Sequence, residues 1–292
     1  TIMSDITRKA PVAGWRMGRL KKANPFGNLL LYIYALVSIY PLIWMFFNSF
    51  KENNEIFVTN PFGVPARFAF TKYMTAWSQY NVPRYFINSV FVSVITVAGC
   101  VALGLLFAYA VARMRFRFQT PLRIYMTLGL FIPVQVIMIP LAILMRDLHL
   151  ANTPWALIVP YIALNLSFTT LVFYGFLRGL PNELEEAACM DGASIYRAFF
   201  SIILPLMVPA IATMTIFIFL TAWNEFTMAL ILVSKEQLKT LPLGLLFFQG
   251  QFTTDWGAMA AAMVTASVPT VLVYVFFSEK VESAMTVGAA VK

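Results

Sequence analysis

Residues 29–47 read LLLYIYALVSIYPLIWMFF, an apolar run without a charged side chain. An α-helix needs about 20 mostly apolar residues to cross the hydrocarbon layer of a bilayer. Pro41 lies inside the run, and spanning helices tolerate proline where neighbouring groups satisfy the freed carbonyl oxygen. The run therefore predicts a membrane-spanning helix.

Five further runs of this kind follow along the chain. They cover about 85–112, 124–145, 155–177, 204–223 and 256–277. The composition agrees, because 60% of the 292 residues are apolar and 12% are charged, whereas soluble domains have about 25% charged residues. We expect an all-α integral membrane protein with six transmembrane helices over residues 29–277.

The distribution of Lys and Arg predicts which ends of these helices face the cytoplasm. Basic residues are about twice as frequent in segments 1–28, 113–123, 178–205 and 278–292 as in the segments between the other helix ends. This predicts that both termini lie inside (N-in/C-in), with a basic cytoplasmic segment at 1–28 and a cytoplasmic tail at 278–292. Four tryptophans then fall at outer helix ends, where interfacial Trp is common: Trp44, Trp155, Trp223 and Trp256. The net charge of +8 is a topology signal, and we expect no nucleic-acid partner.

The predicted outer loop, residues 48–83, is long for a connection without a function. It contains the turn signals Asn60-Pro61 and Phe62-Gly63. Two interpretations remain open for this loop: it docks another protein, or it caps the helix bundle.

The most informative segment is the predicted cytoplasmic loop at 178–205, which holds four acidic residues. Asn182 and Glu185 have the spacing of a capping box at the start of a short helix. Gly192 can take the left-handed conformation that ends such a helix, and Ser194 can cap a second one. Apolar residues at near-helical spacing follow, namely Ile195, Phe199 and Ile203. The loop predicts two short helices with an apolar face that needs a partner.

This loop resembles the signature of binding-protein-dependent ABC importer permeases. In that family Glu-Ala-Ala is followed by three residues, Gly, nine residues, Ile, one residue and Leu-Pro, and the chain has Glu186-Ala187-Ala188, Gly192, Ile202 and Leu204-Pro205 at these spacings. The resemblance implies a coupling helix that docks into a separate ATPase subunit. By resemblance, five residues carry that contact: Glu186, Ala187, Ala188, Asp191 and Gly192.

Other segments are similar to the carbohydrate branch of this family. They are Trp223-Asn224-Glu225-Phe226, Thr240-Leu241-Pro242 and the tail Gly288-Ala289-Ala290-Val291-Lys292. The tail is similar to that of the shorter permease subunit of maltose-type systems, with one extra alanine, and in that subunit it inserts between the ATPases. The resemblance implies these partners: a second permease subunit, two ATPase subunits that bind ATP and Mg, an extracytoplasmic solute-binding protein, membrane lipid and a saccharide substrate. It implies a multi-pass protein of the bacterial cytoplasmic (inner) membrane.

Polar residues inside the predicted spans are candidates for a substrate path, because such residues usually face a bundle interior or a cavity. Asn224 and Glu225, at an outer helix end, are the strongest polar groups, and Thr221 and Asn165 are further candidates. Ser and Thr often bond only to their own helix backbone or bridge helices, so packing is the favoured role for any single one of them.

Catalytic chemistry is not expected from this chain. It contains no Gly-x-x-x-x-Gly-Lys-Ser/Thr phosphate loop, and the single histidine, His149, has no metal-ligand spacing around it. We expect a non-catalytic permease subunit without its own cofactor or metal.

Three other functions are weighed against a sugar importer. The nearest is the same machine for a non-sugar solute, such as a polyamine or a phosphonate. A secondary transporter typically has internal repeats and charged residues at mid-membrane, neither of which the sequence has. A membrane enzyme needs a catalytic constellation, and none is evident.

Overall fold

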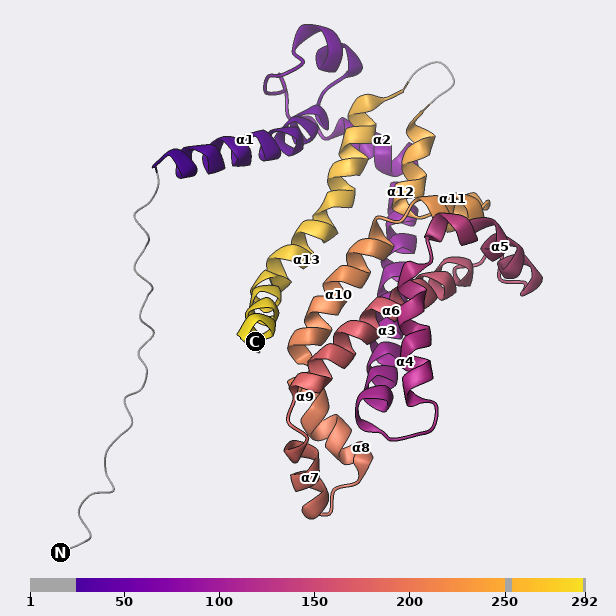
Figure 1. Ribbon diagram of the computed structural model, residues 1–292. Coiled ribbons are helices and arrows are strands. Elements are labelled where there is room, and N and C mark those ends of the chain that lie inside the picture. The colour runs from indigo at the N-terminus through magenta and orange to yellow at the C-terminus, as the bar shows by residue number, and fades with distance from the viewer. Residues whose placement is uncertain (1–24, 250–253, 291–292) are drawn as a thin grey trace, which may run out of the picture. The chain divides into compact units, whose positions relative to one another are not determined.

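The computed structural model describes residues 25–249 and 254–290, with side chains up to residue 276. Within these residues the chain is helical, apart from one isolated bridge between Gln249 and Thr254 (Figure 1). Most of the basic segment predicted at 1–28, and the end of the tail at 291–292, lie outside the described residues. The chain divides into two compact units, Thr1–Met45 and Phe46–Lys292.

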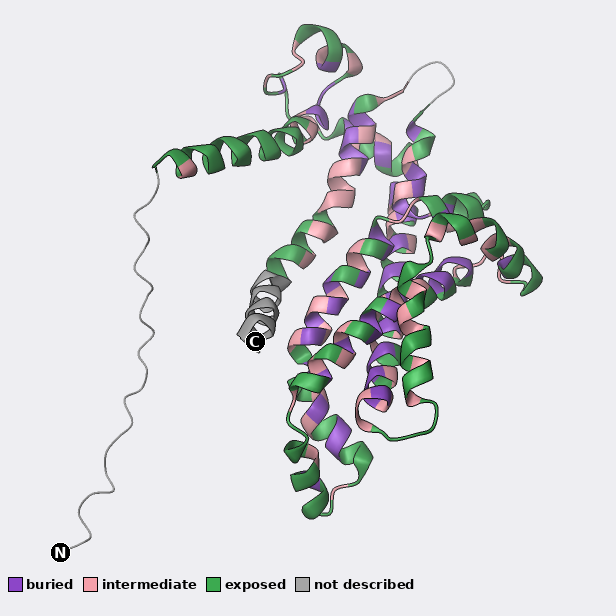
Figure 2. Cartoon of the chain, viewed as in Figure 1, coloured by how far each residue is buried: buried purple, intermediate pink, exposed green. Residues whose placement is uncertain are grey.

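The first unit contributes most of helix α1, Pro25–Asn48. Its side chains are exposed along nearly the whole helix, as Figure 2 shows. Leu31, Tyr34 and Leu36, for example, are all about two-thirds or more exposed. An apolar helix of this kind is suited to contact lipid or another membrane protein.

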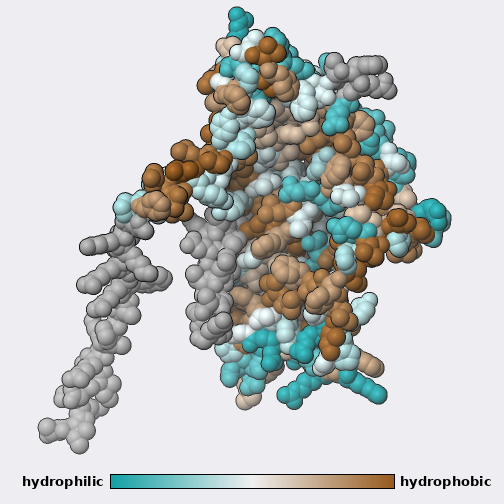
Figure 3. Space-filling model, turned by 45° about the horizontal axis from the view of Figure 1, so that its top comes forward, coloured by the Kyte–Doolittle hydropathy of each residue, from teal (hydrophilic) through white to brown (hydrophobic). Residues whose placement is uncertain are grey.

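The second unit is built around four helices: α3 (Val82–Arg113), α6 (Trp155–Gly179), α10 (Val208–Trp223) and α13 (Trp256–Ala290). Helix α3 packs along α6 and against α10, and α10 packs against α13. Glycine permits the close approach of α3 to α6, because a Cβ atom at Gly104 would lie 2.7 Å from Thr169 Cγ2. Exposed apolar side chains are spread over the face of this unit that Figure 3 shows, with hydrophilic residues gathered at its lower end.

Two of the six predicted spans are not continuous helices. The third consists of α4 (Gln119–Leu128), a 3₁₀ turn (Gly129–Phe131) and α5 (Val134–Asp147), with a 105° bend. The fifth consists of α8 (Ile195–Ala198), a π-helical turn (Phe199–Ile203), α9 (Leu204–Leu206) and α10, with a 70° bend. A proline lies at each break: Pro133 has an extended ψ of 127°, and Pro209 lies at the start of α10. Proline has no backbone N–H, so it cannot donate the hydrogen bond that would continue the preceding helix.

Four described helices are therefore long and apolar enough to span a membrane: α1, α3, α6 and residues 256–276 of α13. The number rises to six if each bent pair crosses once. Helix α13, which contains the sixth predicted span, continues past the end of that span at 277 as far as Ala290.

The segment between α1 and α3 contains a π-helical turn (Glu55–Thr59) and helix α2 (Thr71–Gln79). The side chain of Lys51 is fully buried beneath it and donates to the carbonyl oxygens of Asn60 (2.8 Å) and Gly63 (2.7 Å). Burial lowers the pKa of Lys51, against an opposing effect of the Glu55 carboxylate. The turn signal at Asn60 is confirmed, because its Oδ1 accepts from the backbone N–H of Gly63 at 2.9 Å.

A second lysine ties this segment to the start of α13. Lys72 Nζ lies 2.6 Å from Glu52 Oε2 and 3.2 Å from Asp255 Oδ2. Burial lowers the pKa of Lys72, but hydrogen bonds and charge attraction from the two carboxylates outweigh burial and raise the pKa above its usual value. Because Asn53 also bonds to Thr254 O (2.7 Å) and accepts from Trp256 N (2.9 Å), the segment is fastened over the end of the bundle.

The remaining short elements follow α10. They are α11 (Thr227–Leu232), a 3₁₀ turn (Glu236–Leu238), α12 (Leu241–Gly244) and a 3₁₀ turn (Leu245–Phe248). Trp223 is the last residue of α10, is 2% exposed, and its indole N–H donates to Ala266 O at 3.0 Å. Its aromatic ring fills the contact between α10 and α13.

Candidate functional site

The loop that carries the family signature forms helix α7, Glu183–Met190, followed by the short helix α8. Four of the five predicted coupling residues are exposed: Glu186, Ala187, Asp191 and Gly192. Ala188 is 6% exposed and faces the rest of the chain. The loop therefore presents a contiguous surface of small and acidic residues while one alanine packs beneath it.

The predicted turn at Gly192 is confirmed. Gly192 has a φ of +77°, a conformation that residues with a Cβ atom adopt only with strain. The cap at Ser194 is also confirmed, since its hydroxyl oxygen accepts from the backbone N–H of Arg197 at 3.3 Å. Together these two residues reverse the chain between α7 and α8.

The predicted capping box was wrong. Asn182 has helical backbone angles and its side chain makes no capping bond to α7. Its Oδ1 accepts instead from Arg113, at the end of α3. A stronger cationic donor nearby has displaced the local backbone N–H as the partner of this side chain.

Glu185, the other half of the expected capping box, joins α7 to α3. Its carboxylate accepts from the Tyr109 hydroxyl at 2.7 Å and forms an ion pair with Arg113, whose Nε lies 2.9 Å from Glu185 Oε2. The Arg113 and Glu185 side chains are 8% and 17% exposed, so water screens this ion pair little. Arg113 also donates to Leu180 O at 2.8 Å. The arrangement fixes the start of α7 to the end of a long helix of the bundle.

The apolar face expected on this loop is only partly available to a partner. Phe199 and Ile203 are buried, with 6% and 0% exposure, and pack on their own chain. Ile195, the third residue of the predicted face, is exposed, and so are three apolar residues outside it: Met190, Tyr196 and Phe200. Helical spacing alone did not distinguish these two faces, because the π-helical turn at 199–203 shifts the register.

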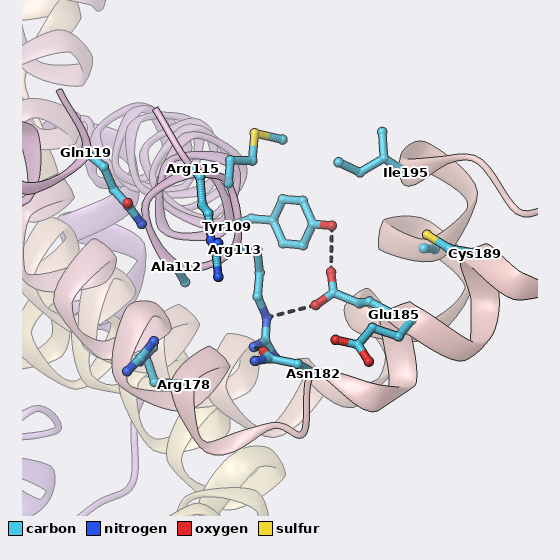
Figure 4. A pocket seen from close by; sticks show the side chains of 13 residues that line it. Tyr109, Ala112, Arg113, Arg115, Gln119, Arg178, Asn182, Glu185, Cys189 and Ile195 are labelled. Carbon is cyan, nitrogen blue, oxygen red and sulfur yellow. Dashed lines mark hydrogen bonds and ion pairs between the residues drawn. The ribbon is translucent and has the colours of Figure 1, made fainter. Parts of the chain in front are cut away.

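A cavity of about 540 Å³ separates this loop from the ends of α3 and α6. Figure 4 shows Glu185 pointing toward Tyr109 and Arg113, with Arg115, Gln119 and Arg178 on the other side of the cavity. Asn182, Glu186 and Cys189 also line it. Sequence reasoning missed the roles of Tyr109 and Arg113, since Arg113 counted only as a topology signal.

The predicted path residues converge on a second cavity, of about 250 Å³, between α6, α10 and α11. Asn165, Thr221 and Glu225 all line it, together with Tyr161. Thr221 Oγ1 lies 3.1 Å from Asn165 Oδ1 on α6 and also within hydrogen-bond distance of two carbonyl oxygens of its own helix, Phe217 O (3.0 Å) and Ile218 O (2.9 Å). Asn224 does not line this cavity; it is exposed and its amide donates to Leu220 O at 2.9 Å.

Glu225 also has a structural role that its position at a helix end did not reveal. Its carboxylate accepts from the backbone N–H groups of Met228 (2.7 Å) and Ala229 (3.0 Å), at the start of α11. It accepts from the Tyr161 hydroxyl at 2.5 Å. Four other polar residues within the helices each bond to a carbonyl oxygen of their own helix: Thr169, Thr213, Thr265 and Ser267.

Sequence comparison finds relatives over nearly the whole chain. Diacetylchitobiose uptake system permease protein NgcG of Streptomyces coelicolor is 35% identical over 263 residues, which covers 89% of this chain and 87% of the relative. Sulfoquinovosyl glycerol transport system permease protein SmoH of Agrobacterium fabrum is 34% identical, over 91% of this chain and 93% of the relative.

Structural comparison points to the same fold. A chain of a bacterial ABC transporter involved in the import of the acidic polysaccharide alginate superposes with a TM-score of 0.78 at 22% identity, over 87% of this chain and 95% of that chain. Residues 100–287, which include the signature loop and both bent pairs, match the family described as "Binding-protein-dependent transport system inner membrane component". The chain belongs to this family of membrane permease components of binding-protein-dependent transport systems.

Proposed function

We propose that the chain is one of two permease subunits of an ATP-driven, binding-protein-dependent importer of sugars or oligosaccharides. Family membership supports the importer class. The substrate class is supported by two relatives whose names refer to diacetylchitobiose and sulfoquinovosyl glycerol, which both contain sugar units. Import proceeds by alternating access, as the bundle changes between inward-open and outward-open arrangements.

The proposed topology has six crossings with both termini in the cytoplasm, so that each bent pair crosses once. Residues 1–28 and 278–292 are then cytoplasmic, 29–277 form the permease domain, 48–83 face outward, and 178–205 form the coupling loop. The concentration of Lys and Arg supports this orientation. The segment between α1 and α3, which Lys51 and Lys72 hold in place, then lies on the side of the solute-binding protein.

The observation that carries the proposal is the fixed connection of the signature loop to the bundle. Glu186, Ala187, Ala188, Asp191 and Gly192 contact a separate ATPase subunit, which binds ATP and Mg. Because Glu185 is held by Tyr109 and Arg113, a push on α7 is transmitted to α3. A loosely attached loop would move by itself and leave the bundle unchanged.

The substrate path passes the cavity around Asn165, Thr221 and Glu225, with Asn224 at its outer end. Amide, hydroxyl and carboxylate groups form the hydrogen bonds that saccharide hydroxyls need. The second permease subunit supplies the other wall of this path. A solute-binding protein delivers the saccharide on the outer side.

The first test is retention of the ATPase by the purified permease. Wild type, Glu186→Lys and Gly192→Asp are solubilised in detergent and mixed with the cognate ATPase. Glu183→Lys is the matched control, since Glu183 lies on α7 but outside the proposed contact set. We expect wild type and the control to retain the ATPase and the two variants to lose it. Failure of wild type to bind any ATPase refutes the proposal, and equal loss in the control refutes the contact set.

A further inference from the structure

The connection between α3 and α4, residues 114–118, alternates apolar and basic side chains. Met114, Phe116 and Phe118 are 39%, 40% and 64% exposed. Arg115 and Arg117 are interleaved with them and are also exposed. Long basic side chains beside exposed aromatic rings are typical of the boundary between the hydrocarbon layer and the lipid headgroups.

The ends of two candidate spans define the depth of this connection. Helix α3 ends at Arg113 and α6 ends at Gly179, and the two ends meet, because Arg113 donates to Leu180 O at 2.8 Å. The cavity of about 540 Å³ opens between them. In the proposed topology both of these helix ends lie on the cytoplasmic side, so the cavity opens toward the anionic surface of the cytoplasmic leaflet.

Charge within the cavity is divided between its two sides. Two carboxylates line one side: Glu185, which pairs with Arg113 and accepts from the Tyr109 hydroxyl, and the exposed Glu186. On the other side, Arg115 and Arg178 line the cavity and make no ion pair or hydrogen bond within the described residues, as Figure 4 illustrates. A cavity of this size is comparable to ordinary small-molecule sites, and two unpaired guanidinium groups complement a phosphate, which accepts bidentate bonds.

We propose that the headgroup phosphate of an anionic phospholipid binds between Arg115 and Arg178, in the cavity between the 114–118 connection and the coupling loop. The interleaved aromatic residues favour a lipid over a soluble anion, since they provide an apolar surface for acyl chains beside the basic groups. The opposite wall of the cavity is α7, so bound lipid stabilises the position of the coupling loop. Only the choice of the cytoplasmic leaflet rests on the proposed function.

The test is lipid binding to the full chain, measured by native mass spectrometry in detergent and repeated with co-purified partner subunits. The probes are phosphatidylglycerol, phosphatidylcholine and glycerol 3-phosphate. The variant Arg115→Gln/Arg178→Gln removes both cations, whereas Arg67→Gln/Arg197→Gln removes the same charge from exposed positions outside the cavity and outside the 114–118 connection. We expect the cavity variant to bind phosphatidylglycerol about 25-fold more weakly, at about fivefold for each cation, and the control to bind like wild type.

Several results overturn this inference. Equal weakening in both double variants shows a general charge effect, and unchanged binding in the cavity variant excludes the site. Glycerol 3-phosphate that binds as tightly as the lipid shows a site for a soluble anion, and equal affinity for phosphatidylcholine shows no anionic preference. Loss of lipid on assembly with the ATPase shows that protein fills the cavity. Binding is read on the chain itself, so each of these results leaves the transport proposal intact.

Discussion

Substitution of Glu185 by alanine tests whether the coupling loop is fixed to the bundle. The change removes the carboxylate that accepts from the Tyr109 hydroxyl at 2.7 Å and forms an ion pair with Arg113 Nε at 2.9 Å. Hydrogen bonds to charged groups contribute about 1.5–3 kcal/mol each. Arg113 keeps its bond to Leu180 O, so we expect a local cost in the upper part of the range for one such bond, about 2–3 kcal/mol.

That cost predicts the population of the open loop. At 1.4 kcal/mol for each factor of ten, 2–3 kcal/mol corresponds to an opening equilibrium raised about 30- to 150-fold. Hydrogen–deuterium exchange of the α7 amides measures this directly, because exchange from a briefly opened helix follows the opening equilibrium.

The control is Glu183→Ala on the same helix. Glu183 is exposed and makes no side-chain bond within the described part of the chain. We expect its α7 amides to exchange at nearly the wild-type rate. If Glu185→Ala and Glu183→Ala exchange at indistinguishable rates, the ion pair does not hold the loop, and the reasoning about force transmission fails.

Three further predictions concern the glycines and the outer segment. Gly192→Ala should weaken the turn after α7 by about 1–2 kcal/mol, because φ is +77° there. Gly175→Ala, near the end of α6 with open space around it, should be neutral or slightly stabilising, and thermal melting of both variants checks the contrast. Gly257→Ala should lower the melting temperature, at a cost of about 1–3 kcal/mol, since a Cβ atom there would lie 2.2 Å from Lys51 O; an unchanged melting temperature contradicts the packing of α13 against this segment. The Lys72 cluster should stabilise the fold fully below pH 10.5, the usual pKa of lysine, and lose that contribution as pH rises through the raised pKa. The difference in melting temperature between wild type and Lys72→Met, followed from pH 9 upward, should shrink above that value; a constant difference contradicts the charge contribution.

The helical elements were largely predictable because apolar run length is a local property of the sequence. The runs beginning near Leu29, Tyr85, Trp155 and Trp256 all lie in helices of spanning length. The breaks near Pro133 and Pro209 were not predicted, since proline occurs in continuous helices as well. Pro160 lies inside the unbroken α6, so the residue type alone does not decide between a bend and a straight helix.

The site was predictable only where local backbone rules determine it. Gly192 and Ser194 have the conformations that turn and capping chemistry require. Asn182 and Glu185 followed the local pattern of a capping box, but both bond to residues of α3, about 70 positions earlier in the chain. Without a contact map, no signal near these residues could identify Tyr109 and Arg113 as partners.

The central claim is that this chain works as the permease of an ATP-driven saccharide importer. The most direct measurement is uptake of labelled saccharides into proteoliposomes that contain the chain with its second permease and ATPase subunits. We predict uptake that requires both the solute-binding protein outside and ATP at the cytoplasmic face, and that Glu186→Lys abolishes. Uptake driven by an ion gradient, without ATPase or binding protein, would contradict the claim.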